Sequence, residues 1–201
     1  MSLIIAIKNQ AGLVMGCDSA IMVEEGRVEK VECFSNAKIW AMSEVCLADA
    51  YLSAPTVLIG GVGTVRDINV VKAKVGAPSD LDADTIVLEL MPEIRDALIE
   101  YGFISGEKPY SNMDSSFVVG DRDHLYIIGH DYSVIERNDF AVIGYCDNEA
   151  KALIEKDLPK IRKMSISELG YYIEEIILHC AKSCTFVDGP VYTKVLMQHN
   201  D

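Results

Sequence analysis

The first residues of the chain show the polarity pattern of a β-hairpin. Leu3–Lys8 and Leu13–Cys17 are short apolar runs, and the turn-forming residues 9–12 separate them. If the chain turns there, opposed residues have numbers that sum to about 21, which brings Leu3 next to Asp18. The register alone therefore predicts a carboxylate beside the start of the chain.

The rest of the pattern alternates groups of strands with pairs of helices. Further strands are predicted at Lys38–Met42, Thr56–Ile59, Ser115–Val119, Leu125–Ile128, Tyr132–Glu136, Phe140–Ile143 and Val191–Met197, with a polar ribbon or loop at Ile21–Glu32. Helices are predicted at Thr64–Val75, Asp82–Tyr101, Asp147–Asp157 and Ser165–Cys184. Pro92 should kink or split the second helix, and Ser165 with Glu168 should form a capping box. Such an order predicts an α+β fold of stacked, largely antiparallel sheets with helices outside.

Composition narrows the class of protein. A chain of 201 residues suits one domain, 1–201, with a substantial core. The net charge of −13 argues against nucleic acid as a partner, because phosphate binding needs a basic face. Apolar runs stay well short of the roughly 20 residues that span a bilayer, and the start lacks a basic signal region. We therefore expect a cytoplasmic protein without a membrane segment.

The cysteines do not indicate a metal or a cofactor. The six cysteines are expected to be reduced thiols, because no secretion signal accompanies them. His179, Cys180 and Cys184 lie close together in sequence, but no CxxC pair is present to complete a zinc site. The histidines are scattered, so we expect no metal and no cofactor.

Ser2 and Lys38 are candidates for chemistry. Methionine is generally removed before a small residue, and removal of Met1 would leave Ser2 with a free α-amine of pKa near 8. That amine could take the proton of the serine hydroxyl and generate a nucleophile. Lys38 opens a predicted strand, and its charge would lower the pKa of a neighbouring amine. The ordinary alternatives are a simple start residue and a snorkelling surface lysine.

A pair of glycines follows the strand at Thr56–Ile59. Gly60-Gly61 is interpreted as a strand-to-helix turn, where the missing Cβ atoms let the backbone approach a substrate. An N–H group there could donate to an oxyanion. The alternative is a glycine pair that only fits a tight turn.

Together these features resemble the proteasome β-type family of N-terminal-nucleophile hydrolases. The resemblance spans nearly the whole chain, and the ordered spacing of the segments carries it rather than any one motif. The matching segments are Ser2–Lys8, Gly12–Ser19, Lys38–Ile39, Ile59–Gly61, Leu125–Ile128 and Ala141–Gly144, followed by Ala150.

The resemblance implies a four-layer α/β/β/α sandwich. It also implies that the N-terminal residue, here Ser2, attacks a peptide carbonyl. Asp18 and Lys38 match the family's catalytic aspartate and lysine, and Gly60 matches the glycine whose amide faces the oxyanion. Members of that family form rings with the active sites inside a chamber, so we expect a homo-oligomer, with peptide or protein as substrate.

The sequence departs from the family at four places. Where the family has Gly-Ser-Gly, this chain has Gly-Tyr-Cys at residues 144–146. Where the family has a late Asp-x-x-Ser-Gly, residues 185–189 keep one acidic residue, Asp188, shifted by three positions. Ala20 replaces an arginine, and Ser43–Pro55 is an insert. If Met1 is retained, its peptide bond to Ser2 removes the α-amine that would act as base.

Three hypotheses follow. The leading one is an amide-bond hydrolase, a threonine-protease-like peptidase acting through Ser2. The second is a non-catalytic proteasome-like subunit with an assembly or binding role. The third is a related enzyme that cleaves or rearranges another amide. The substrate, the ring size and any ATPase partner are left open.

Overall fold

The computed structural model describes residues 2–22, 28–30, 38–42, 56–78, 80–108 and 111–197. The strands are β1 (Leu3–Asn9), β2 (Gly12–Cys17), β3 (Ala20–Met22), β4 (Val28–Lys30), β5 (Ile39–Met42), β6 (Val57–Gly63), β7 (Ser115–Gly120), β8 (Leu125–Ile128), β9 (Val134–Glu136), β10 (Phe140–Gly144) and β11 (Tyr192–Met197). The helices are α1 (Val65–Lys74), α2 (Ala83–Thr85), the π-helical η3 (Ile86–Leu90), α3 (Met91–Glu100), α4 (Asp147–Ile161) and α5 (Ile166–Ser183).

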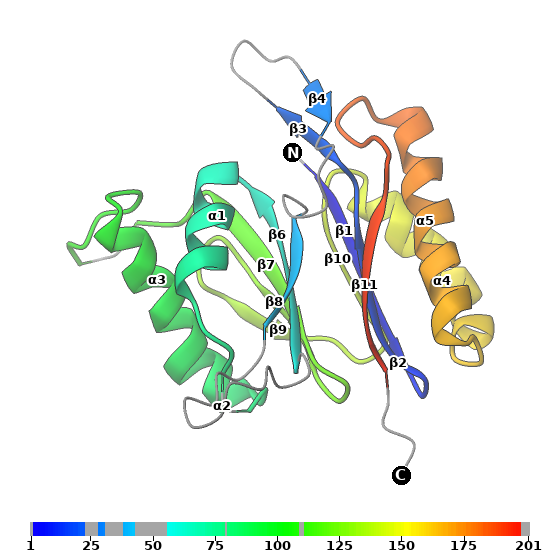
Figure 1. The fold of residues 1–201 in the computed structure, drawn as a ribbon, viewed down its shortest axis with the longest axis horizontal. Coiled ribbons are helices and arrows are strands. Elements are labelled where there is room, and N and C mark those ends of the chain that lie inside the picture. The colour runs from blue at the N-terminus through cyan, green and yellow to red at the C-terminus, as the bar shows by residue number, and fades with distance from the viewer. Residues whose placement is uncertain are drawn as a thin grey trace, which may run out of the picture.

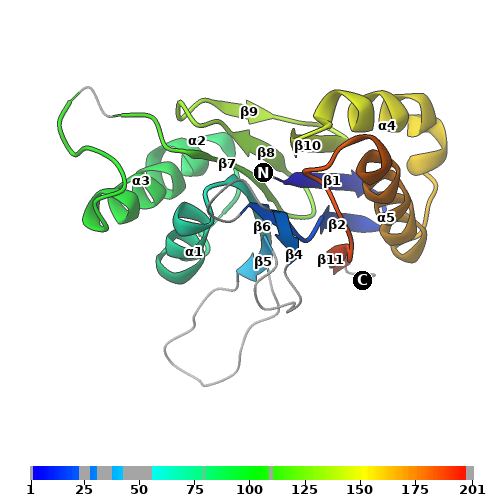
Figure 2. The same cartoon turned by 90° about the horizontal axis from the view of Figure 1, so that it is seen from above.

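These elements form four layers. One antiparallel sheet has the order β10-β1-β2-β11, and the other has the order β5-β6-β7-β8-β9. Figure 1 shows the two sheets face to face, with α1 and α3 outside one of them and α4 and α5 outside the other. Figure 2, seen from above, shows the same order and places the start of the chain between the two helical layers. The predicted α/β/β/α sandwich is confirmed.

Burial on both faces explains the continuous apolar run of β1. Side chains alternate across a strand, so neighbouring residues face different layers. Leu3, Ile5 and Ile7 pack in the cluster under α4 and α5. Ile4 and Ala6 pack between the sheets. A strand covered on both sides has no polar face to show in its sequence.

The register of the first hairpin is the predicted one. Ile4 pairs with Cys17, and the main-chain N–H of Asp18 donates to the carbonyl oxygen of Leu3 at 3.3 Å. The polar segment after it forms a two-stranded ribbon where it is described, because β3 pairs with β4. The capping box at Ser165 and Glu168 is also present.

Two predicted elements differ from those observed. Gly60-Gly61 is not a turn, because β6 continues through both glycines to Gly63, paired along its length with β7. The helix around Pro92 forms as α2, η3 and α3, and Pro92 lies in the first turn of α3, where a missing N–H costs least. The wide π-helical turn therefore takes the place of a kink. The insert 43–55 lies outside the described residues.

Among the described helices, none is long and apolar enough to cross a bilayer.

Candidate active site

Asp18 joins the first strands of the fold at one buried point. Its side chain is completely buried. One carboxylate oxygen accepts the N–H of Leu3 at 2.9 Å, and the other accepts the N–H of Ala20 at 3.0 Å. Burial raises the pKa of this carboxyl, whereas the charge of Lys38 and these amide donors pull it down. Asp18 therefore fixes the main chain directly after Ser2.

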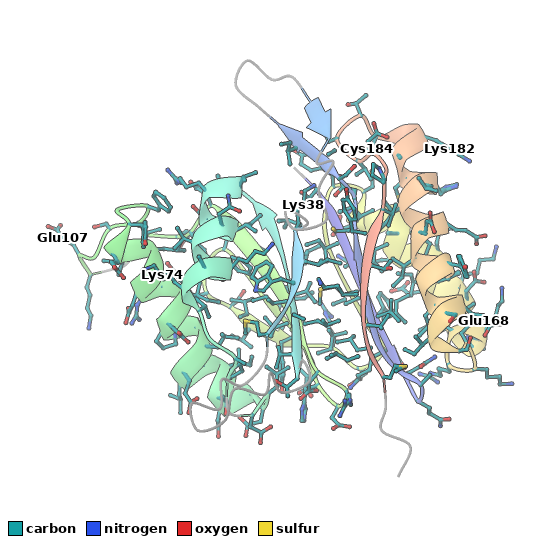
Figure 3. All side chains as sticks on the ribbon, in the orientation of Figure 1. Lys38, Lys74, Glu107, Glu168, Lys182 and Cys184 are labelled. Atoms are coloured by element: carbon teal, nitrogen blue, oxygen red, sulfur yellow. The ribbon has the colours of Figure 1, made fainter. Side chains whose placement is uncertain are left out.

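Lys38 is the cation of this site. It precedes β5, is only 5% exposed, and its Nζ lies 3.1 Å from Oδ1 of Asp18. The same Nζ donates to the carbonyl oxygen of Ala20. Figure 3 shows Lys38 between the two sheets, at the end of the molecule where the described chain begins. A buried lysine with a carboxylate and a carbonyl as partners is not the snorkelling surface lysine that the sequence left open.

Ser2 is held by its main chain on the side away from Asp18. It is 2% exposed, and its carbonyl oxygen accepts the N–H of Tyr145 at 2.7 Å. Tyr145 follows β10, which pairs with β1 from Leu3 onward. Ser2 is thus fixed between two segments that lie far apart in the sequence.

A cavity of about 590 Å³ opens beside Ser2. Its walls come from the end of β6, the start of β7, the β10–α4 turn and one residue after β8. The lining residues besides Ser2 are Val62, Gly63, Thr64, Asp114, Ser115, Ser116, His130, Gly144, Tyr145, Cys146 and Asp147. The volume is in the range of small-ligand sites, and a peptide side chain fits in it.

Gly60 and Gly63 have different places in β6. Gly60 lies mid-strand, paired with Ile39 on one side and Val118 on the other, and it does not line the cavity. The N–H of Gly61 donates to the carbonyl oxygen of Lys38 at 2.9 Å. N–H groups two residues apart in a strand point to the same side, so the N–H of Gly63 points to the same side as that of Gly61, past the start of β5. The N–H of Gly60 points to the opposite side, toward β7.

Gly63 and His130 are cavity residues that the sequence reasoning missed. Gly63 had a usable signal, since it is the last glycine before the helix predicted to begin at Thr64. It has a positive φ of 126°, and a Cβ there would lie 2.2 Å from the carbonyl oxygen of Asp114. His130 had no such signal in the sequence, because only the pairing of β7 with β8 brings it to the cavity.

Two thiols near the site have raised pKa values. Burial raises the pKa of Cys17 to about 12. Burial, together with a hydrogen bond to Cys184, raises the pKa of Cys146 to about 12. Thiols are nucleophilic as thiolates, so neither cysteine is primed to attack a substrate at neutral pH.

The structure also gives the contacts of the late acidic residue Asp188 and of the His179–Cys180 segment. The carbonyl oxygen of Asp188 accepts the N–H of Ser19 at 3.0 Å, so the late acidic residue contacts the start of the ribbon through its main chain. His179 lies 3.1 Å from Glu149, and Cys180 is buried. Within the described parts of the chain, no group of three or more potential metal ligands comes together.

Gly144→Ala is expected to destabilise the protein by about 2 kcal/mol, because a side chain is strained in this left-handed conformation. Gly144 has a φ of 107°, and a Cβ there would lie 1.9 Å from the carbonyl oxygen of Ser2. Urea denaturation measures the change. Gly170→Ala in α5 is the matched control: it has nothing within 4 Å, so it should gain up to about 1 kcal/mol. Equal stability of Gly144→Ala and wild type would contradict this account.

Sequence comparison finds no matching family model and no matching curated protein. Solved structures match over almost the whole chain. BPH of Thiobacillus denitrificans has a TM-score of 0.74 at 11% identity over 99% of this chain and 100% of that one. The same protein in complex with epoxomicin has a TM-score of 0.73 at 12% identity over 97% and 98%.

Two other kinds of protein share the fold. Anbu (ancestral beta-subunit) of Yersinia bercovieri has a TM-score of 0.70 at 11% identity over 97% of this chain and 81% of that one. Eukaryotic HslV of Trypanosoma brucei has a TM-score of 0.61 at 14% identity over 98% and 99%. Anbu of Pseudomonas aeruginosa, described as a helical assembly, has a TM-score of 0.71 at 12% identity over 97% and 81%. The resemblance is confirmed at the level of the fold: this chain has the proteasome β-type fold, the four-layer sandwich that it shares with BPH, Anbu and HslV.

Proposed function

We propose that this protein is an amide-bond hydrolase, a peptidase whose nucleophile is the hydroxyl of Ser2 after removal of Met1. One observation carries the proposal: the buried Asp18–Lys38 ion pair is bonded to the main chain directly after Ser2, beside a cavity that Ser2 lines. Burying an ion pair is costly unless it is well hydrogen-bonded, and it gives little net stability. A role in chemistry accounts for its place at the start of the chain.

The reaction follows from these groups. The α-amine of Ser2 takes the hydroxyl proton, and the oxygen attacks the carbonyl carbon of the substrate. The positive charge of Lys38 favours the neutral amine and the developing alkoxide. Collapse of the tetrahedral intermediate expels the leaving amine, which takes the proton and leaves an acyl ester on Ser2. The α-amine then takes a proton from water as the water oxygen attacks the ester carbon, the bond from that carbon to the Ser2 oxygen breaks, and the proton passes to that oxygen as the acid is released.

The oxyanion donor in this proposal is the N–H of Gly63 rather than that of Gly60. Gly63 lines the cavity with Ser2, and the strand alternation directs its N–H past the start of β5. Gly60 lies inside the sheet, and its Cβ direction faces Met15, Ile39 and Ile4 in the core. Backbone donors fixed by a strand end are well suited to an oxyanion, because they need no reorganisation.

The proposal also covers the oligomeric state, the substrate and the cellular location of the protein. The description of one Anbu as a helical assembly supports self-association of this chain, and we propose a homo-oligomer that encloses the cavities. Its substrate would be a peptide or an unfolded protein segment, in the cytoplasm. The fold leaves the number of subunits and any ATPase partner open.

Mass spectrometry of protein treated with a β-lactone or with epoxomicin tests the proposal. We expect a chain that begins at Ser2 and carries one adduct, located on Ser2 after proteolytic mapping. The epoxomicin complex of BPH, a protein of the same fold, motivates this probe. Ser2→Ala protein should remain unlabelled. Retained Met1 without any adduct would overturn the proposal, and an adduct on Cys146 would assign a different nucleophile.

The rival proposal is a non-catalytic subunit. It is favoured by the replacement of the family's Gly-Ser-Gly with Gly144-Tyr145-Cys146, where the serine side chain is lost. An assembled particle that resists both probes, with Ser2 at its N-terminus, would support this rival. An enzyme acting on another amide would instead be labelled at Ser2 but fail to cleave peptides.

A further inference from the structure

The hydroxyl of Thr64 is a buried polar group without a partner. Three buried side-chain polar atoms of the described residues lack a hydrogen bond: Nε1 of Trp40, Oγ1 of Thr64 and Nε of Arg122. Thr64 is the one that lines the cavity beside Ser2. Buried polar atoms in folded proteins are nearly always bonded, so an exception beside a proposed nucleophile needs an explanation.

The position of Thr64 would normally give its hydroxyl a partner. Thr64 is the N-cap of α1, with φ −76° and ψ 134°, yet its side chain makes no capping bond. A threonine there usually accepts an N–H from the first turn. The hydroxyl of Thr64 is therefore not used to hold the helix.

We propose that the Thr64 hydroxyl donates a hydrogen bond to the carbonyl oxygen of the scissile peptide bond, as a second donor beside the N–H of Gly63. The inference rests on the proposed function. Thr64 directly follows Gly63, and both residues line the cavity that Ser2 lines. Its Oγ1 is covered and has no bond to break in this structure, so the proposal includes a step between staggered χ1 positions that turns the hydroxyl toward the cavity.

The chemistry of the group favours a carbonyl oxygen as its partner. A hydroxyl donates one hydrogen, and a peptide carbonyl accepts it without adding charge to the cavity. The same hydrogen bond strengthens as negative charge develops on that oxygen, so its contribution is largest in the transition state. Thr64 is in this way a catalytic residue for the acylation step.

Thr64→Val and Thr64→Ser form the matched pair for the test. Valine keeps the shape and removes the hydroxyl, and serine keeps the hydroxyl. With a fluorogenic peptide, we expect Thr64→Val to lower kcat by about 100-fold, the loss typical of one oxyanion donor, and to leave KM within about 3-fold. Thr64→Ser should keep kcat within about 5-fold of wild type, since it restores the donor.

Thermal unfolding supplies a readout that does not depend on activity. Removing a hydroxyl that has no partner should leave the melting temperature of Thr64→Val equal to that of wild type or higher. A lower melting temperature for Thr64→Val, with Thr64→Ser unchanged, would show that the hydroxyl stabilises the free protein, and it would overturn the inference.

The remaining outcomes separate this inference from the proposed function. Equal kcat for Thr64→Val and wild type, in a protein that Ser2→Ala inactivates, overturns only the role of Thr64. Absence of turnover and of any Ser2 adduct in the wild-type protein overturns the proposed function, and this inference with it. A kcat loss shared by Thr64→Val and Thr64→Ser would assign the effect to the methyl group and also overturn the role of the hydroxyl.

Discussion

Ser2→Ala is expected to lower kcat/KM for peptide hydrolysis by at least about 1,000-fold, because the variant has no oxygen to attack the carbonyl. Ser2→Thr should retain activity, since it keeps the hydroxyl and the α-amine on one residue. Both replacements are small, so Met1 should be removed from all three proteins. A fluorogenic peptide assay on protein whose N-terminus has been verified by mass spectrometry measures the effect.

The same change should leave the fold intact, which makes Ser2→Ala a clean test. Two bonds that fix this segment belong to the main chain and are kept in the variants: the carbonyl oxygen of Ser2 accepts from Tyr145, and the N–H of Leu3 donates to Asp18. We expect urea denaturation midpoints of Ser2→Ala and Ser2→Thr to match that of wild type. Undiminished turnover by folded Ser2→Ala would exclude Ser2 as the nucleophile.

Lys38→Met is expected to reduce the free energy of unfolding by about 3–5 kcal/mol, because it leaves the buried carboxylate of Asp18 without its cation. Peptide turnover should fall by more than about 100-fold, since Lys38 no longer biases the amine of Ser2. Denaturant unfolding and the peptide assay measure the two effects. Exposed Lys74 is the control, and Lys74→Met should stay within about 0.5 kcal/mol of wild type.

The pH dependence of the Lys38→Met variant has a definite sign. Burial already raises the pKa of Asp18 above its ordinary value of 3.8, and Lys38 opposes that rise. Without Lys38 the pKa in the folded state rises further. Between 3.8 and that raised value the folded chain binds more protons than the unfolded chain, so the free energy of unfolding decreases as the pH increases. The variant should therefore be more stable at pH 5 than at pH 8.

A double variant separates the two roles of the pair. Asp18→Asn with Lys38→Met removes both charges, so it should regain part of the stability that Lys38→Met loses. It should regain no activity, because the cation near Ser2 is still missing. A double variant that is less stable than Lys38→Met at pH 8 would contradict the assignment of the loss to an unpaired buried charge.

The first hairpin shows what sequence reasoning could derive about this site. A single turn and strict alternation set the register, so the contact between Leu3 and Asp18 followed from counting residues. Lys38 could be placed at a strand start, but its burial could not be derived. Its partner Ala20 belongs to β3 and its partner Asp18 lies between β2 and β3, and a lysine that precedes an apolar strand is equally typical of a surface.

The glycines of β6 show where the reasoning failed. Gly60-Gly61 suggested a turn, since glycine weakens a strand interior. In the structure both glycines lie in close contact between layers: a Cβ on Gly61 would lie 2.9 Å from Ile68, and one on Gly60 would lie 2.9 Å from Met15. Tertiary packing decided their role, and the strand end moved to Gly63. The cavity was equally out of reach, because its walls meet only through sheet pairing.

The way Ser2 and Leu3 are anchored implies that the chain can fold before the residues in front of Ser2 are removed. The main-chain bonds to Tyr145 and Asp18 use the carbonyl oxygen of Ser2 and the N–H of Leu3. A peptide extension before Ser2 therefore removes none of them, and a chain with an N-terminal purification tag should reach the same fold while its α-amine stays blocked. If Ser2 is the nucleophile, as proposed, such a preparation would be folded but inactive, and a single proteolytic cut that exposes Ser2 would activate it.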